Sequence, residues 1–113
     1  MQTSVKQKFN LKNKVAIVTG ASKGIGESIA RGLAEYGAKV VISSRNQEAV
    51  DQVANNLKKE GYDALGIACH VGDEDQLKKL VEETMNAYGG VDILVNNAAT
   101  NPFYGPLDTM EKA

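Results

Sequence analysis

The chain has 113 residues, of which 42% are hydrophobic, enough for one domain with a buried core and too few for two. Thirteen basic and fourteen acidic side chains nearly cancel, which excludes a nucleic acid or an anionic membrane as the main partner. No apolar run could span a bilayer, and the first eight residues lack the apolar core of a secretion signal. One cysteine and one histidine exclude an internal disulfide and a zinc cluster, so we expect a cytoplasmic domain without a metal.

Short apolar runs alternate with longer amphipathic stretches along the chain. The predicted strands are 15–19, 39–43, 64–69 and 91–96, which are rich in β-branched or apolar residues. The predicted helices are 26–36, 47–60 and 74–88, with Asn46 and Asp73 as N-caps of the second and third. Strands separated by helices of this length must run parallel, joined by right-handed crossovers.

Apolar residues at helical spacing predict which side of each helix faces the sheet. Ile25, Ile29 and Leu33 recur every four residues, with Ala30 and Ala34 beside them, and form one face of the first helix. In the third helix the same pattern predicts these inward side chains: Leu77, Leu80, Val81, Met85 and Tyr88. Cys69, at the end of a buried strand, is expected to be a small core residue with an inert thiol.

A glycine-rich turn follows the first strand, where residues 19–26 read Thr-Gly-Ala-Ser-Lys-Gly-Ile-Gly. Gly20 allows the tight turn, Gly24 lets a pyrophosphate approach the backbone, and Gly26 lets the helix pack closely on the sheet. The helix start offers free N–H groups and a partial positive charge to a phosphate. No Gly-Lys-Ser or Gly-Lys-Thr follows, which excludes a P-loop, so the turn predicts a dinucleotide site.

The end of the second strand indicates which dinucleotide binds. An acidic residue there would bond both ribose hydroxyls and select NAD, but this chain has Ser43, Ser44 and Arg45. Arg45 can bind a 2′-phosphate through its planar fork, and Lys23 in the glycine turn can add a charge. Arg45 and Lys23 together therefore predict NADP as the cofactor. The competing interpretation is that both are ordinary solvated side chains that bind no phosphate.

Together with Asn-Asn-Ala-Ala at residues 96–99, these motifs resemble the short-chain dehydrogenases/reductases, and the likeness runs from about residue 11 to residue 106. The resemblance implies an oxidoreductase that moves a hydride between NADP(H) and a small carbonyl or alcohol substrate, and a homo-oligomeric parent protein. We predict an α/β fold, a Rossmann-type doubly wound parallel sheet with four strands in the order 3-2-1-4. The cofactor would lie across the carboxyl ends, at the switch between the first and fourth strands.

The resemblance also implies the roles of individual residues. The phosphates would be lined by Gly20, Ser22, Lys23, Gly24, Ile25 and Gly26. The adenosine ribose would meet Ser44, Arg45 and Asn46. Asn97, Ala98 and Ala99 would pass beside the cofactor, while Asn96 would tie the fourth strand to its neighbours. Phe103 and Tyr104 would wall an apolar substrate or tuck into a surface loop.

Two positions depart from the family pattern. Ala99 replaces a glycine, which costs little if its backbone φ is negative. The family often places an acidic residue after the third strand to bond the adenine amino group, whereas this chain has His70 and Val71 there. That contact must come from His70 or from backbone. The run from Cys69 to Gly72 is similar to a carbonyl-reductase branch of the family.

The family's chemistry rests on an asparagine, a serine, a tyrosine and a lysine, all of which would lie beyond Ala113. None of the four tyrosines is followed by lysine at the fourth position, so we expect no catalysis from these residues alone. We interpret residues 1–113 as one NADP-binding domain with a lead-in over 1–12. Within these residues the fourth strand would be left as an exposed edge, so we expect them to be the N-terminal part of a longer protein. The alternatives are a truncated, non-catalytic NADP(H)-binding module and an adenosylmethionine methyltransferase, against which Ser44 and Arg45 argue.

Overall fold

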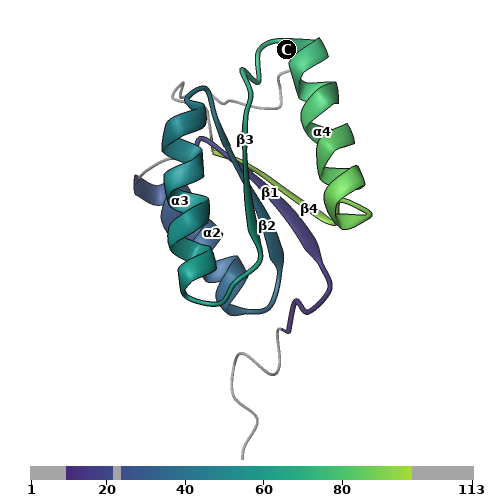
Figure 1. The fold of residues 1–113 in the computed structure, drawn as a ribbon. Helices are drawn as coiled ribbons and strands as arrows, with labels where there is room; N and C mark the ends of the chain where they lie inside the picture. The colour runs from purple at the N-terminus through teal and green to yellow at the C-terminus, as the bar shows by residue number, and fades with distance from the viewer. Residues whose placement is uncertain (1–9, 22–23, 98–113) are drawn as a thin grey trace, which may run out of the picture.

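Four strands form one parallel sheet in the order β3-β2-β1-β4, which confirms the predicted order. The structure is a computed structural model and describes residues 10–21 and 24–97. The strands are β1 (Val15–Thr19), β2 (Lys39–Ser44), β3 (Ala64–Ala68) and β4 (Ile93–Asn96). Two helices, α2 (Gly24–Glu35) and α3 (Gln47–Lys59), cover one face of the sheet, and α4 (Glu74–Tyr88) covers the other (Figure 1).

β1 is the central strand, and all five of its residues are buried. It pairs with β2 in a register that sets Ile17 opposite Val41, and with β4 in a register that sets Ile17 opposite Leu94. A strand flanked on both edges and covered on both faces must be apolar throughout, which explains the continuous Val-Ala-Ile-Val run.

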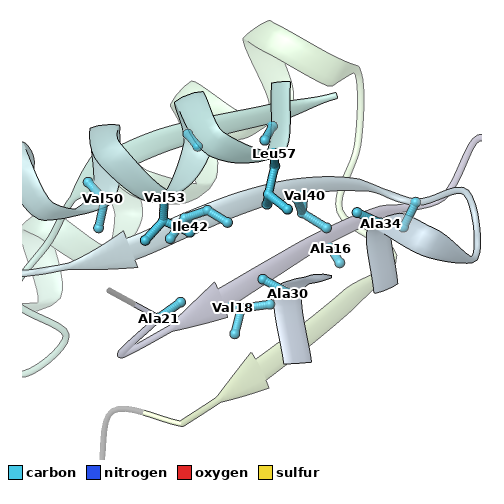
Figure 2. Close-up of a cluster of buried hydrophobic side chains, with 13 residues drawn as sticks. Ala16, Val18, Ala21, Ala30, Ala34, Val40, Ile42, Val50, Val53 and Leu57 are labelled. Carbon is cyan, nitrogen blue, oxygen red and sulfur yellow. The ribbon is translucent and has the colours of Figure 1, made fainter. Parts of the chain in front are cut away.

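Each face of the sheet has its own apolar cluster. Under α2 and α3, Val18, Ile42 and Leu57 are among the fully buried side chains, which Figure 2 shows meeting between helices and strands. Under α4 the cluster consists of Ile17, Val41, Ile67, Cys69 and Leu80. Full burial of one such aliphatic side chain contributes about 1.5–3 kcal/mol, so the two clusters hold the helices to the sheet.

The helix ends follow the sequence signals. The Asn46 side chain accepts a hydrogen bond from Ala49 N at 3.0 Å, and Asp73 Oδ1 accepts from Asp75 N at 3.0 Å and from Gln76 N at 3.2 Å. Each cap satisfies N–H groups that have no partner inside the helix. Both predicted N-caps are therefore confirmed.

Some predicted faces and boundaries are wrong. Ile25 is 72% exposed, although the rest of its predicted face is confirmed: Ala30 and Ala34 are buried, and Ile29 and Leu33 pack against the core. Val81 and Met85 are also exposed, while α4 buries Leu80 and Thr84. α2 begins two residues earlier than predicted, at Gly24, and β4 begins two residues later, at Ile93.

β3 and α3 approach each other with little space between their backbones. A Cβ on Gly66 would lie 2.8 Å from the carbonyl oxygen of Val50, closer than real Cβ contacts. Only glycine therefore fits this position of β3. Among the described residues, no helix is both long and apolar enough to span a membrane, and no three His, Cys, Asp or Glu side chains gather into a metal site.

Candidate nucleotide-binding site

The glycine turn joins the central strand to the first helix at the carboxyl edge of the sheet. Gly20 and Gly24 have φ angles of 64° and 65°, in the left-handed region that side chains rarely adopt. A Cβ on Gly26 would lie 2.3 Å from the carbonyl oxygen of Gly20 and 2.8 Å from the Cα of Ala21. The turn therefore brings the N–H groups at the start of α2, which lack intrahelical partners, against the end of β1. Such a helix start attracts a phosphate.

Thr19 and two asparagines connect β1 to β4 beside this turn. Thr19 Oγ1 donates to Asn96 Oδ1 at 3.0 Å and accepts from the backbone N–H of Asn97 at 3.0 Å. The Asn97 side chain donates to the carbonyl oxygen of Gly20 at 3.3 Å. Asn96 thus ties β4 to its neighbour, as predicted. The role of Thr19 was not predicted, because its only signal in the sequence is a hydroxyl at the end of a buried strand.

A pocket of about 170 Å³ opens at the carboxyl ends of β1, β2 and β3. Its lining residues are Thr19, Gly20, Ser43, Ser44, Arg45, Cys69, His70 and Val71. Five of the predicted site residues therefore meet at this pocket. Gly20, Ser44 and Arg45 come from the ends of β1 and β2, and His70 and Val71 come from the turn after β3. Among the residues that the structure describes, no carboxylate lines the pocket, so none of them neutralises Arg45 there.

Asn46 lies outside this pocket lining. Its side chain caps α3, and its backbone N–H donates to Ser44 Oγ at 3.2 Å, which fixes the turn that carries Arg45. Its function in the structure is therefore to shape the end of β2. The predicted site residues Ser22, Lys23, Ala98 and Ala99 lie outside the described residues, as do Phe103 and Tyr104.

Two small side chains in the pocket wall have unusual environments. The hydroxyl of Ser43 is buried and has no hydrogen-bond partner among the described residues, a rare state for a buried polar group. Burial, and secondarily the charge of Asp73, raises the pKa of the Cys69 thiol. The thiol therefore stays neutral near pH 7 and is a poor nucleophile. The inert cysteine was predicted from the sequence, whereas the unpaired hydroxyl of Ser43 was not.

A crossover sheet of this order, with a glycine turn at the switch between β1 and β4, defines the class of dinucleotide-binding α/β domains. The family model described as short chain dehydrogenase matches residues 14–112. The chain belongs to the short-chain dehydrogenase family.

Individual relatives agree with this assignment. "Dehydrogenase/reductase SDR family member 4" of Sus scrofa is 52% identical over 105 residues, which are 93% of this chain and 38% of the relative. A 2-keto-3-deoxy-D-gluconate dehydrogenase structure from Streptococcus agalactiae has a TM-score of 0.77 and 44% identity, covering 86% of this chain and 36% of that one. A variant actinorhodin polyketide ketoreductase solved with NADPH has a TM-score of 0.71 and 39% identity, covering 74% and 32%. The chain spans about two fifths of the length of the curated relatives it matches.

Proposed function

We propose that this chain binds NADP(H) and is the cofactor-binding part of an oxidoreductase that acts on a small carbonyl or alcohol substrate. The observation that carries the proposal is Arg45, which follows β2 and lines a pocket where the described residues place no carboxylate. A carboxylate at this place would repel a 2′-phosphate, whereas a guanidinium binds one through two parallel hydrogen bonds. When bound, the nicotinamide supplies or accepts the hydride.

The residues present fit a dinucleotide. A Cβ on Gly26 would fill the space between α2 and the glycine turn, and the start of α2 offers N–H groups to a pyrophosphate. We assign the phosphates to the turn and to the first residues of α2, with Ile25 exposed at that end. Ser22 and Lys23 complete the proposed phosphate site, and Ser44 with Arg45 the ribose site. Asn97, Ala98 and Ala99 complete the side next to β4.

Comparison supports the NADP preference by analogy. The polyketide ketoreductase solved with NADPH has the same fold over three quarters of this chain. Charge-assisted hydrogen bonds contribute about 1.5–3 kcal/mol each, so one Arg45–phosphate contact would favour NADP by about tenfold or more.

The test is a fluorescence titration of the chain with NADPH and with NADH. We expect NADPH to bind at least about tenfold more tightly, and Arg45→Ala to remove most of that difference. Arg45→Asp should shift the preference towards NADH, because its carboxylate can accept from the free ribose hydroxyls. Lys58→Ala, which removes one positive charge at the far end of α3, is the matched control and should leave the ratio unchanged.

Unchanged relative affinities in Arg45→Asp would contradict the role of Arg45. Failure of the unmodified chain to bind either nucleotide would contradict the proposed function.

A second candidate is a module that binds NADP(H) without turnover, which is favoured by the lack of any Tyr-x-x-x-Lys among the 113 residues. Following NADPH absorbance with a panel of aldehydes and ketones separates the two. Steady oxidation of NADPH by this chain would rule out the binding-only module. We also propose a cytoplasmic parent protein, which the balanced charge and the single cysteine support, and a homo-oligomeric one, which membership of the family supports.

A further inference from the structure

We propose that Ser43 is a further ligand-contacting residue of the pocket, and that its hydroxyl is paired only when the phosphorylated adenosine end of NADP(H) is bound. The inference rests on the proposed binding of NADP(H) and adds one residue to that site. Its basis is a contrast within Ser43, whose backbone is held on both sides while its side chain has no partner.

The backbone of Ser43 lies between two neighbouring strands near the end of β2. The residue is in register with Thr19 of β1 and with Ile67 of β3. Its carbonyl oxygen accepts a hydrogen bond from the N–H of Ala21, in the glycine turn, at 3.0 Å. Ser43 is therefore fixed by regular pairing, and a misplaced backbone does not account for the unpaired hydroxyl.

The surroundings of the Ser43 side chain give it no structural reason to be polar. Alternate residues of a strand lie on the same face, so Ser43 shares its face with Val41, a member of the apolar cluster under α4. Ile67 and Cys69, at the end of the neighbouring strand, belong to the same cluster. Ser43 is fully buried, and an unpaired hydroxyl in such surroundings is unfavourable. Alanine would suit this position better in the free chain.

The two other hydroxyls of the described pocket lining are paired. Thr19 Oγ1 donates to Asn96 Oδ1 at 3.0 Å, and Ser44 Oγ accepts from the N–H of Asn46 at 3.2 Å. Ser43 lines the same pocket, so its unused hydroxyl lies at the wall of the proposed nucleotide site. A buried polar group without a partner at such a wall indicates a ligand that supplies one.

Rotation about χ1 would bring this hydroxyl to the ligand. Oγ is covered in the free chain, although Ser43 lines a pocket of about 170 Å³. A serine in a strand has more than one staggered χ1 position open to it, so the hydroxyl can turn toward the pocket without a change of the backbone. Arg45 lines the same pocket, so the ligand group that meets Ser43 belongs to the end of the nucleotide that carries the 2′-phosphate.

The first test combines two measurements that a merely structural residue would move in the same direction. Ser43→Ala should raise the urea midpoint of the free chain, because it removes an unpaired buried hydroxyl and breaks no hydrogen bond. The same variant should bind NADPH about three- to tenfold more weakly, because the bound state loses a hydrogen bond.

Thr84→Val is the matched control. The Thr84 hydroxyl is equally buried but is paired, since it donates to the carbonyl oxygen of Leu80 at 2.8 Å. This variant should therefore lower the urea midpoint and leave the affinity for NADPH unchanged. Circular dichroism checks that both variants keep the fold.

The second test locates the contact on the nucleotide. Ser43→Ala should weaken the binding of adenosine 2′,5′-bisphosphate by the same factor as that of NADPH. The three-bond couplings between Hα and Hβ of Ser43 report χ1, and we expect them to change when NADPH saturates the unmodified chain.

The outcomes separate this proposal from the one on which it rests. Tight NADPH binding that Ser43→Ala leaves unchanged would overturn the role of Ser43 and leave the proposed function standing. An equal or lower urea midpoint of free Ser43→Ala would do the same, since the hydroxyl would then contribute to the free chain. So would a loss of affinity for NADPH alone, or couplings that NADPH does not alter. Failure of the unmodified chain to bind NADPH would overturn both proposals.

Discussion

Asp92 bonds both backbone groups of Val15, at the start of the central strand. Its Oδ2 accepts from Val15 N at 2.9 Å, and its own N–H donates to Val15 O at 2.8 Å. The side chain of Asp92 thus acts as an additional rung between β1 and β4, one residue before β4 begins.

We expect Asp92→Ala to destabilise the chain by about 1–3 kcal/mol, because the partly buried N–H of Val15 loses a charged acceptor. Asp92→Asn keeps an acceptor oxygen and should recover much of this loss. Urea denaturation measures both. Equal midpoints for Asp92→Ala and the unmodified chain would show that the contact contributes nothing.

Gly26 and Gly32 form a matched pair in α2. A Cβ on Gly26 would collide with the backbone of the glycine turn, whereas one on Gly32 meets nothing within 4 Å. Gly26→Ala should therefore cost about 1–3 kcal/mol and abolish NADPH binding. Gly32→Ala should stabilise the helix by about 0.5–1 kcal/mol and leave binding intact. Thermal unfolding and NADPH titration test the pair, and normal binding by Gly26→Ala would contradict the close packing.

The side chain of Gln47 closes the free edge of β3. Its Nε2 donates to Gly66 O at 3.1 Å and its Oε1 accepts from Ala68 N at 2.9 Å, the pattern that a neighbouring parallel strand would make. Edge strands covered in this way are protected from pairing with other chains.

Gln47→Ala should speed hydrogen exchange at the amide of Ala68 by about tenfold and increase aggregation at high concentration. Gln52→Ala, on the exposed side of the same helix, is the control and should do neither. Exchange measured by NMR decides the first point and light scattering the second. An unchanged Ala68 amide would mean that Gln47 gives no protection.

Cys69 should resist alkylation in the folded chain. Its raised pKa, caused first by burial, keeps the thiol protonated, while the unfolded chain ionises near the ordinary value of about 8.5. Iodoacetamide at mildly alkaline pH should therefore label the native chain roughly tenfold or more slowly than the chain in urea. By the same linkage, the free energy of unfolding should fall as pH rises above about 8.5. Equally fast labelling of both states, read by mass, would contradict the buried thiol.

The strand order and both helix caps could be predicted because their signals are local and strong. Continuous β-branched runs separated by capped amphipathic helices allow few arrangements, and Asn46 and Asp73 occupy the N-caps that they predicted. The glycine turn could be predicted equally well, since Gly20 and Gly24 adopt the positive φ angles that the motif requires.

The errors came from features that depend on tertiary contacts. Helical periodicity predicted that Met85 faces the core, but the buried residues of α4 are Leu80 and Thr84. The Thr84 hydroxyl donates to the carbonyl oxygen of Leu80 at 2.8 Å, so this polar side chain can be buried. Hydrophobic spacing cannot show that a threonine has satisfied its own hydrogen bond. The pairings of Asp92 with Val15 and of Gln47 with Gly66 join residues far apart in the sequence and leave no local pattern.

The central position of β1 also constrains the order in which the chain can fold. β1 can pair with β2 as soon as α2 and β2 have been synthesised, but its other edge stays unpaired until β4 has been made. The Val15–Asp92 contact across that second edge spans 77 residues. Closing such a long loop costs more entropy than closing the short one, so the β1–β4 pairing forms late. During synthesis β1, whose five residues are all buried in the finished sheet, therefore keeps one edge unpaired until β4 has been made, and a chaperone could shield it in that interval.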